Sequence, residues 1–431
     1  MNRRIAASSI LILLSVSACS SQPLDQQAFD STVHISKQTA PGNGVTSHSA
    51  LMSAGALAFG RDDVLFVGDS IAGKVHAFEL TDTQLDDQSG YQLGRAQTFE
   101  GRTIIERLDR EIADVLRTHA DEISINDMVI HQSSMQVFIS AHKGHGPNPD
   151  AFILKVNDGK VEVVHLDSVR HTAQSVGLVP NTGTFEFGQS QRRLAVTDID
   201  YFNGEIFVAG ISNEEFSSKL RRMTYPFNNQ VGVSSIEIWH AVHAQYETRA
   251  PIITQTIAEL DGEPTLIAIY ACTPIVRLPL SELVDGAKVR GQMIGEMGFG
   301  NTPIDIVSYV NMMDKSDNVI VTNTNRSAAQ IPLQAIAGAD EMPHGEGVGP
   351  VFSVSGVLQY PMPMSGTQHL DILGDQWAIT IRQSPEDSRN IQLHTLPLPF
   401  FFDRADHIVE MNWADGPDPF GYKSAPPVEY D

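Results

Sequence analysis

The fold is decided by a stretch that runs from Ala56 to Ser70 and reads ALAFGRDDVLFVGDS. A short apolar segment at 56–59 is followed by a turn of glycine, arginine and two aspartates, and then by a strongly β-forming segment at 64–67. Two apolar runs of this length around such a turn predict a pair of antiparallel strands. After the next polar turn, a third strand is expected at 74–80.

The same three-strand pattern recurs along the chain at intervals of roughly 50 to 75 residues, which is longer than a minimal propeller blade and implies insertions. Repeated short strands with glycine and polar turns favour radially arranged blades, because a sandwich would not repeat one signature in this way. We predict an all-β protein, a six- or seven-bladed β-propeller, with seven blades favoured. The further copies lie at 127–131, 137–140 and 151–156; at 198–202, 205–209 and 219–224; at 252–257, 265–271 and 275–280; at 304–309, 319–322 and 330–333; and at 369–373, 376–381 and 390–396. A seventh blade would use 160–166 or 351–358, together with 407–411.

One helix is expected to interrupt this pattern, at 102–119. Its apolar residues recur at helical spacing on one face, whereas charged residues occupy the other face. We expect this helix to be an insertion packed on the propeller, and the alternative is a helix that binds a partner. The apolar residues are Ile104, Ile105, Leu108, Ile112, Val115 and Leu116.

The stretch at 56–70 resembles the repeats of the NHL and SMP-30 groups of propeller proteins. Three other stretches resemble a group of secreted bacterial propeller proteins that have no assigned reaction: EISIND at 122–127, SNEEFSSKLR at 212–221 and YACTP at 270–274. The resemblance covers most of residues 50–400 and implies the fold. Calcium-dependent lactonases of the SMP-30 type use a set of Glu, Asn and Asp that has no residue-by-residue match here, so their activity is not carried over.

The N-terminus has the pattern of a secretory signal. Arg3 and Arg4 precede an apolar run at 5–16, too short to span a bilayer, and residues 16–19 (VSAC) resemble the lipobox that is cleaved before a lipidated cysteine. We therefore expect a signal peptide at 1–18, lipid on Cys19 as the membrane anchor, a flexible tether at 19–50, the propeller at 51–414 and a proline-rich tail at 415–431. Ser20 after the cysteine favours the outer membrane, and the expected location is the bacterial periplasm.

The composition of the chain excludes one class of binding partner. The chain has 431 residues, and 52 acidic against 29 basic residues give a net charge of −23, so a broad nucleic-acid surface is excluded by repulsion. The apolar fraction of 42% is enough for a large core. There are two cysteines. If Cys19 carries lipid, Cys272 has no intrachain partner and is buried, paired between chains or chemically employed.

Repeat geometry predicts which distant residues meet. The starts of the inner strands and the loops between the second and third strands open on the same face of a propeller, where ligands usually bind. The inner strands place four aspartates there, which either bond backbone amides or form a ring that attracts a cation such as Ca²⁺. These candidates are Asp127, Asp198, Asp305 and Asp371, with His369 beside the last. The loops add Asp69, His142, His145, Glu214, Glu215, Cys272, Asn323, Asn325, Arg326 and Arg382, and we select Arg326 and Arg382 as ligand-binding candidates.

A second candidate site lies at 239–249. His240 and His243 can converge if they lie in a loop, and Cys272 should lie on the same face. Two imidazoles with a thiolate or carboxylate suit Zn²⁺, Cu or Fe, so His240, His243 and Cys272 are the predicted metal ligands, and Glu247 is an alternative third ligand. Packed or solvated histidines are the alternative explanation.

The leading functional hypothesis is a lipid-anchored module that binds a periplasmic protein or a small ligand through its loop-rich face. One alternative is a metal-dependent oxidoreductase or hydrolase at the His/Cys site, with Glu247 or Asp127 handling protons. The other alternative is a calcium-dependent, lactonase-like enzyme that uses the aspartate ring.

Overall fold

The computed structural model describes residues 50–85, 101–186, 189–311, 314–345, 349–362, 364, 366–374 and 377–398, all of which belong to the unit 44–431. The signal peptide, Cys19, the tail at 415–431 and the strand expected at 407–411 lie outside these residues, as does the tether except for its last residue. Among the described helices, none has the length and apolar character needed to cross a membrane.

The described chain is mostly β, and each of the six predicted triplets coincides with three consecutive antiparallel strands. The first sheet contains β1 (Leu57–Phe59), β2 (Val64–Asp69), β3 (Lys74–Glu79) and β9 (Arg170–Ser175), and the second contains β5 (Ile123–His131), β6 (Gln136–Lys143), β7 (Asp150–Asn157) and β8 (Lys160–Val163). Two further four-stranded sheets contain β21 (Pro303–Val310), β22 (Asp317–Asn323), β23 (Ala329–Pro332) and β25 (Tyr360–Pro361), and β26 (Thr367–Leu373), β27 (Trp377–Gln383), β28 (Ile391–Pro397) and β4 (Arg102–Ile105).

The remaining large sheet has ten strands: eight form a continuous hydrogen-bonded path, and two others pair with strands of that path. It joins two antiparallel sets of four strands through a parallel contact between their outer strands, β15 and β20. The first set is β12 (Asp198–Phe202), β13 (Glu205–Ile211), β14 (Ser218–Thr224) and β15 (Gly232–His240), and the second is β17 (Ile252–Leu260), β18 (Glu263–Tyr270), β19 (Pro274–Pro279) and β20 (Lys288–Glu296). β16 (Gln245–Glu247) pairs with β15, β24 (Ser355–Gly356) pairs with β20, and β10 (Phe185–Glu186) forms a separate hairpin with β11 (Gln189–Ser190).

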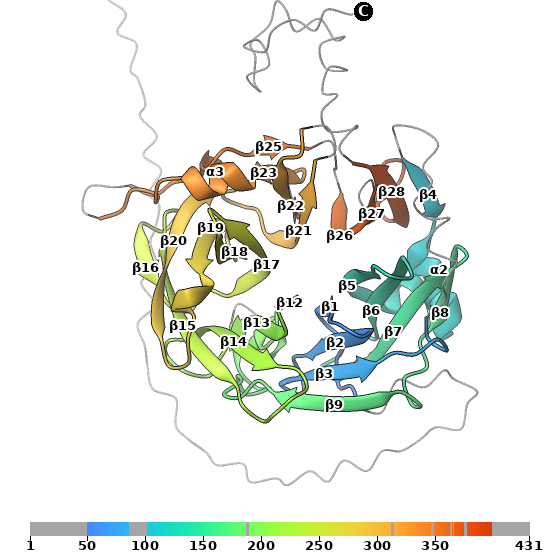
Figure 1. The fold of residues 1–431 in the computed structure, drawn as a ribbon. Coiled ribbons are helices and arrows are strands. Elements are labelled where there is room, and N and C mark those ends of the chain that lie inside the picture. The colour runs from blue at the N-terminus through green and yellow to red at the C-terminus, as the bar shows by residue number, and fades with distance from the viewer. Residues whose placement is uncertain are drawn as a thin grey trace, which may run out of the picture. The chain divides into compact units, whose positions relative to one another are not determined.

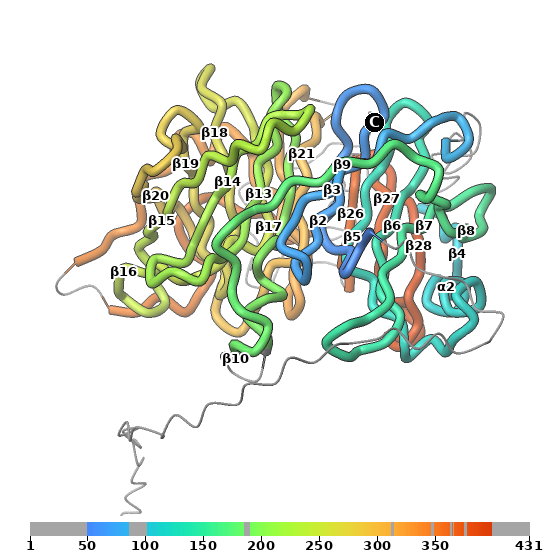
Figure 2. The backbone as a smooth tube through the Cα atoms, turned by 90° about the horizontal axis from the view of Figure 1, so that it is seen from below, coloured from blue at the N-terminus to red at the C-terminus, as the bar shows by residue number. Residues whose placement is uncertain are grey.

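The first strand of each set lines a central channel (Figure 1). Going round the ring, these inner strands contact one another in the closed order β12, β17, β21, β26, β5, β1 and back to β12. This arrangement is propeller-like. Seen after a rotation of 90°, the strands run side by side between two opposite faces, where the turns gather (Figure 2).

The order of the sheets around the ring is not the order along the chain. The sheet of β5 lies between those of β1 and β26, so the chain must pass back beyond β1 to reach β12. The two segments that connect these sheets each contribute an edge strand to a third sheet. β4, between β3 and β5 in the chain, pairs with β28, and β9, between β8 and β12, pairs with β3. Segments separated by about 290 residues are thus joined in one sheet, for example Thr103 and His394.

Two sequence expectations need correction here. The helix predicted at 102–119 is shorter, α2 (Leu108–Leu116), because residues 102–105 form β4 instead, a β-branched run that completes the edge of another sheet. A second short helix, α3 (Leu333–Gly338), follows β23, and single 3₁₀ turns lie at Ala120–Glu122, Gln191–Leu194 and Leu280–Glu282. The segments suggested for a seventh blade are used elsewhere, in β8 and β24.

Apolar side chains fill the space between neighbouring sheets. One cluster lies between the sheets of β5 and β26 and is covered by α2, whose Leu108, Ile112 and Leu116 are fully buried in it. Burying one such side chain stabilises the fold by about 1.5–3 kcal/mol. The helix therefore packs on the propeller, as its apolar face predicts.

Candidate functional site

The inner strands open at one end into a pocket of about 430 Å³, which we call the mouth pocket. It is lined by residues from all the four-stranded sets, because every inner strand begins there. Its lining is Ser53, Gly55, Ala56, Ser70, Ile71, Ile125, Asn126, His142, Pro149, Arg193, Leu194, Val196, Thr197, Ile253, Pro303, Ile304 and His369.

β-Bulges at the start of inner strands shape this pocket. The register of β5, β17 and β21 shifts at Asn126, at Ile253 and around Ile304, and these residues line the pocket. A bulge leaves one residue without a ladder partner and changes the direction of its side chain. These bulges therefore turn side chains of the inner strands toward the mouth pocket.

His142 and Asn126 hold the segment that leads into β1. The Nε2 atom of His142 accepts a hydrogen bond from the Ala54 N–H at 2.9 Å, and the Asn126 amide donates to the Ala54 carbonyl at 2.8 Å. Burial lowers the pKa of His142 to about 4, and the nearby Arg193 charge acts in the same direction. The imidazole is therefore neutral at pH 7 with its proton on Nδ1, which makes that atom a hydrogen-bond donor.

Arg193 is the cation of the mouth pocket, and sequence reasoning missed it. Its neighbour Arg192 donates to the carbonyls of Ser70, Ile71 and Pro180 and so fixes the segment before β12. Arg193 itself is exposed and makes no hydrogen bond or ion pair with another described residue. No sequence pattern distinguishes Arg193 from other surface arginines, because its position depends on how Arg192 anchors the segment before β12.

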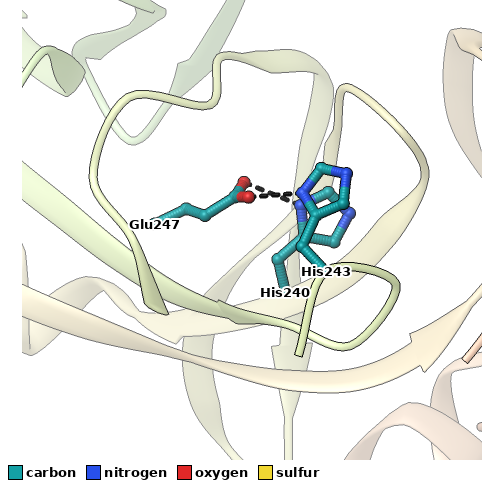
Figure 3. A group of neighbouring side chains, drawn as sticks. All are labelled: His240, His243 and Glu247. Carbon is teal, nitrogen blue, oxygen red and sulfur yellow. Dashed lines mark hydrogen bonds and ion pairs between the residues drawn. The ribbon is translucent and has the colours of Figure 1, made fainter. Parts of the chain in front are cut away.

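His240, His243 and Glu247 come together at the loop-rich end of β15 (Figure 3). The Nδ1 atom of His240 lies 2.7 Å from one oxygen of Glu247, and Nδ1 of His243 lies 2.5 Å from the other. His240 ends β15, and a tight turn brings His243 back over it, so the ring centroids are 4.2 Å apart. Burial raises the pKa of Glu247, but its hydrogen bonds to the two histidines outweigh this and lower the pKa to about 2.

Cys272 does not belong to this group of facing ligand atoms. It lies in the turn between β18 and β19, is free and partly buried, and has a positive φ of 62°. Burial raises the pKa of its thiol, and the charges of Glu247 and Glu296 raise it further. The ligand atoms that face one another are those of His240, His243 and Glu247, so Glu247 and not Cys272 provides the third donor in this geometry.

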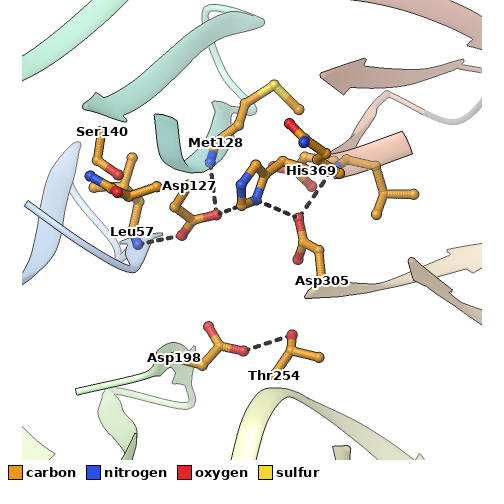
Figure 4. Close-up of polar contacts among 12 residues, drawn as sticks. Leu57, Asp127, Met128, Ser140, Asp198, Thr254, Asp305 and His369 are labelled. Atoms are coloured by element: carbon orange, nitrogen blue, oxygen red, sulfur yellow. Dashed lines mark hydrogen bonds and ion pairs between the residues drawn. The ribbon is translucent and has the colours of Figure 1, made fainter. Parts of the chain in front are cut away.

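The aspartates of the inner strands face the channel, around a cavity of about 390 Å³ (Figure 4). Each accepts a hydrogen bond from the N–H of the next residue on its own strand. Its other oxygen accepts a bond of 2.6 to 3.0 Å from an N–H of the following inner strand, always in the same sense round the ring. The pairs are Asp198 with Gln255, Asp305 with Leu370, Asp371 with Ile130 and Asp127 with Leu57.

This pattern gives the aspartates a structural role: they connect neighbouring sheets. Burial raises the pKa of Asp198 and of Asp371 to about 7 and that of Asp127 well above its usual value, with the Asp305 charge contributing to all three. Nδ1 of His369 lies 3.6 Å from both Asp127 and Asp305, between the channel and the mouth pocket. The backbone amides that these aspartates bond belong to their own strand and to the neighbouring inner strand.

The other ligand-binding candidates do not reach the mouth pocket. Arg326 is exposed and its guanidinium packs against Gly298, and Arg382 donates to Gln392 at 3.2 Å. His145 bonds the carbonyl of Asp121.

Comparison with known proteins gives a likeness of fold only. No family model and no curated protein matches the chain. Among solved structures, a native arabinanase from Bacillus subtilis has 14% identity and a TM-score of 0.35, over 64% of this chain and 94% of that one. The luciferin-regenerating enzyme has 10% identity and a TM-score of 0.29, over 82% and 94%. The plexin A4 extracellular region has 8% identity and a TM-score of 0.35, over 83% and 51%. At these values the likeness carries no argument about activity, and the propeller-like arrangement follows from the sheet topology described above.

Proposed function

We propose that the protein is a binding module that takes a small anionic ligand, such as a carboxylate, in the mouth pocket. The observation that carries this proposal is Arg193, a cation that has no ion-pair partner among the described residues and lies at a pocket lined by all six four-stranded sets. The neutral His142 adds a donor N–H, and a guanidinium binds a carboxylate through charge-assisted hydrogen bonds.

The calcium-dependent alternative has less support. Both oxygens of each ring aspartate already accept backbone N–H groups, so the ring has a structural explanation without a cation.

We also propose that each four-stranded set is one blade, which makes six blades.

The test is a thermal-shift titration of the full chain with citrate, succinate and D-glucuronate, and with glucose as the uncharged control. At least one carboxylate should raise Tm in a saturable way, because a ligand that binds only the folded state stabilises it. Arg193→Gln should weaken this binding roughly tenfold or more, as expected for a charged hydrogen-bonding contact. Arg110→Gln, an exposed arginine on α2, is the matched control and should bind like the wild type. A chain that responds to none of the carboxylates, or an Arg193→Gln variant with unchanged affinity, contradicts the proposal.

Attachment to the outer membrane is a separate part of the proposal. Lipid on Cys19 would hold the module at the periplasmic side of the outer membrane, where it would meet a small ligand or a protein. Cys19→Ala should move the protein from the membrane fraction to the soluble fraction. An unchanged membrane fraction would exclude lipid on Cys19 as the anchor.

A further inference from the structure

We propose that His240, His243 and Glu247 form a binding site for a divalent transition metal ion such as Zn²⁺. The ligands would be the two Nδ1 atoms and the Glu247 carboxylate. This inference is independent of the mouth pocket, whose lining includes none of the three residues.

The donor set is the first argument. Two neutral imidazoles and one carboxylate are a common ligand set of zinc sites that keep a fourth position open for water or substrate. Ligand atoms of all three side chains lie within 4.8 Å of one another. Donors at 2.0–2.2 Å around a tetrahedral metal ion are about 3.3–3.6 Å apart, so the present contacts of 2.5 and 2.7 Å would widen by about 0.6–1 Å when an ion enters.

The second argument is that the backbone preorganises these groups. His240 is the last residue of β15 and Glu247 the last of β16, and the two strands pair with Ile238 opposite Glu247. The turn between them is closed by a hydrogen bond from the His243 N–H to the His240 carbonyl. Gln245 donates to the Glu247 carboxylate at 3.1 Å, which holds that side chain in place. All three ligands thus come from one hairpin, and their positions do not depend on a distant segment.

The third argument is burial. The side chain of His240 is 1% exposed, that of Glu247 is 16% exposed and that of His243 is 44% exposed. Among the described residues, the buried Nε2 atom of His240 has no hydrogen-bond partner, whereas its Nδ1 atom faces Glu247. His243 gives solvent access and can adjust to the ion. The three ligands thus run from a buried imidazole to a solvent-accessible one, so an ion could reach the site from the side of His243.

The experiment is a titration of the full chain with Zn²⁺ after EDTA treatment, followed by calorimetry, with Co²⁺ as a spectroscopic probe. We expect binding of one ion at this site and visible absorption bands of imidazole-bound Co²⁺. His243→Ala and Glu247→Gln should each weaken binding at least about 100-fold, which is more than the loss typical of residues that only support a ligand. Both changes remove a contact of the buried His240, so the melting temperature of each metal-free variant is compared with that of the metal-free wild type to separate loss of the ion from loss of the fold.

His344→Ala is the matched control, because this histidine packs against the adjacent Trp239 but is outside the ligand set. It should bind the ion like the wild type. Absence of stoichiometric binding overturns the proposal, and so does wild-type affinity in either His243→Ala or Glu247→Gln. Binding that survives loss of His243 and is abolished by Asp305→Asn would place the ion at Asp127, Asp305 and His369 and would also overturn it.

Discussion

At the scale of single residues, the structure predicts that Cys272 is a poorly reactive thiol. Burial and the charges of Glu247 and Glu296 raise its pKa, so the reactive thiolate is scarce at neutral pH. Alkylation by iodoacetamide at pH 7 should be several-fold slower in the native protein than in urea. Glu247→Gln removes one of the opposing charges and should speed the native reaction, whereas Glu237→Gln should not. A native rate equal to the rate in urea would show that this environment does not suppress the thiolate.

At the scale of elements, α2 is expected to stabilise the ring although it belongs to no sheet. Ile112 is fully buried between α2 and the sheets of β5 and β26. Ile112→Ala leaves a cavity there and should lower the free energy of unfolding by about 2–4 kcal/mol. Arg110→Ala, on the exposed face of the same helix, should change it by less than about 0.5 kcal/mol. Urea denaturation of both variants measures the difference, and an equal effect of the two would mean that α2 is only loosely attached.

At the scale of the whole molecule, the buried carboxyls make stability depend on pH. Asp198, Asp371 and Glu296 have pKa values of about 7, well above the value of about 4 in an unfolded chain. Between about pH 4 and 7 the folded state therefore binds more protons than the unfolded state, and these groups stabilise the fold less as the pH rises. His142 acts in the opposite direction, because its pKa of about 4 lies below the unfolded value and its contribution is lost on acidification.

Since the raised carboxyls outnumber this histidine, Tm should be higher near pH 5.5 than near pH 8. Protonation also reduces the repulsion within a chain of net charge −23, which adds to the same trend. Asp371→Asn should reduce the slope, although it costs stability at both pH values by removing one acceptor. A melting temperature that rises steadily from pH 5.5 to pH 8 would contradict this prediction.

The candidate sites differ in how far sequence could predict them. His240, His243 and Glu247 lie within eight residues of one another, and a turn between them suffices to bring them together. Cys272 was expected beside them because both segments lie on one face, but sharing a face does not fix the distance between two loops. The inner-strand aspartates were expected at the mouth of the channel but line the channel cavity, and only their hydrogen-bond partners on neighbouring strands revealed what they do.

The sequence by itself determined the strands, their grouping in threes and the face on which the loops open, because alternation and turn residues are local properties. The tertiary structure decided the order of the sheets round the ring, the use of residues 102–105 and 170–175 as edge strands of other sheets, and the position of Arg193. These features depend on pairings between segments far apart in the chain. Their free energy comes from contacts that form only once the ring closes, so no local pattern encodes them.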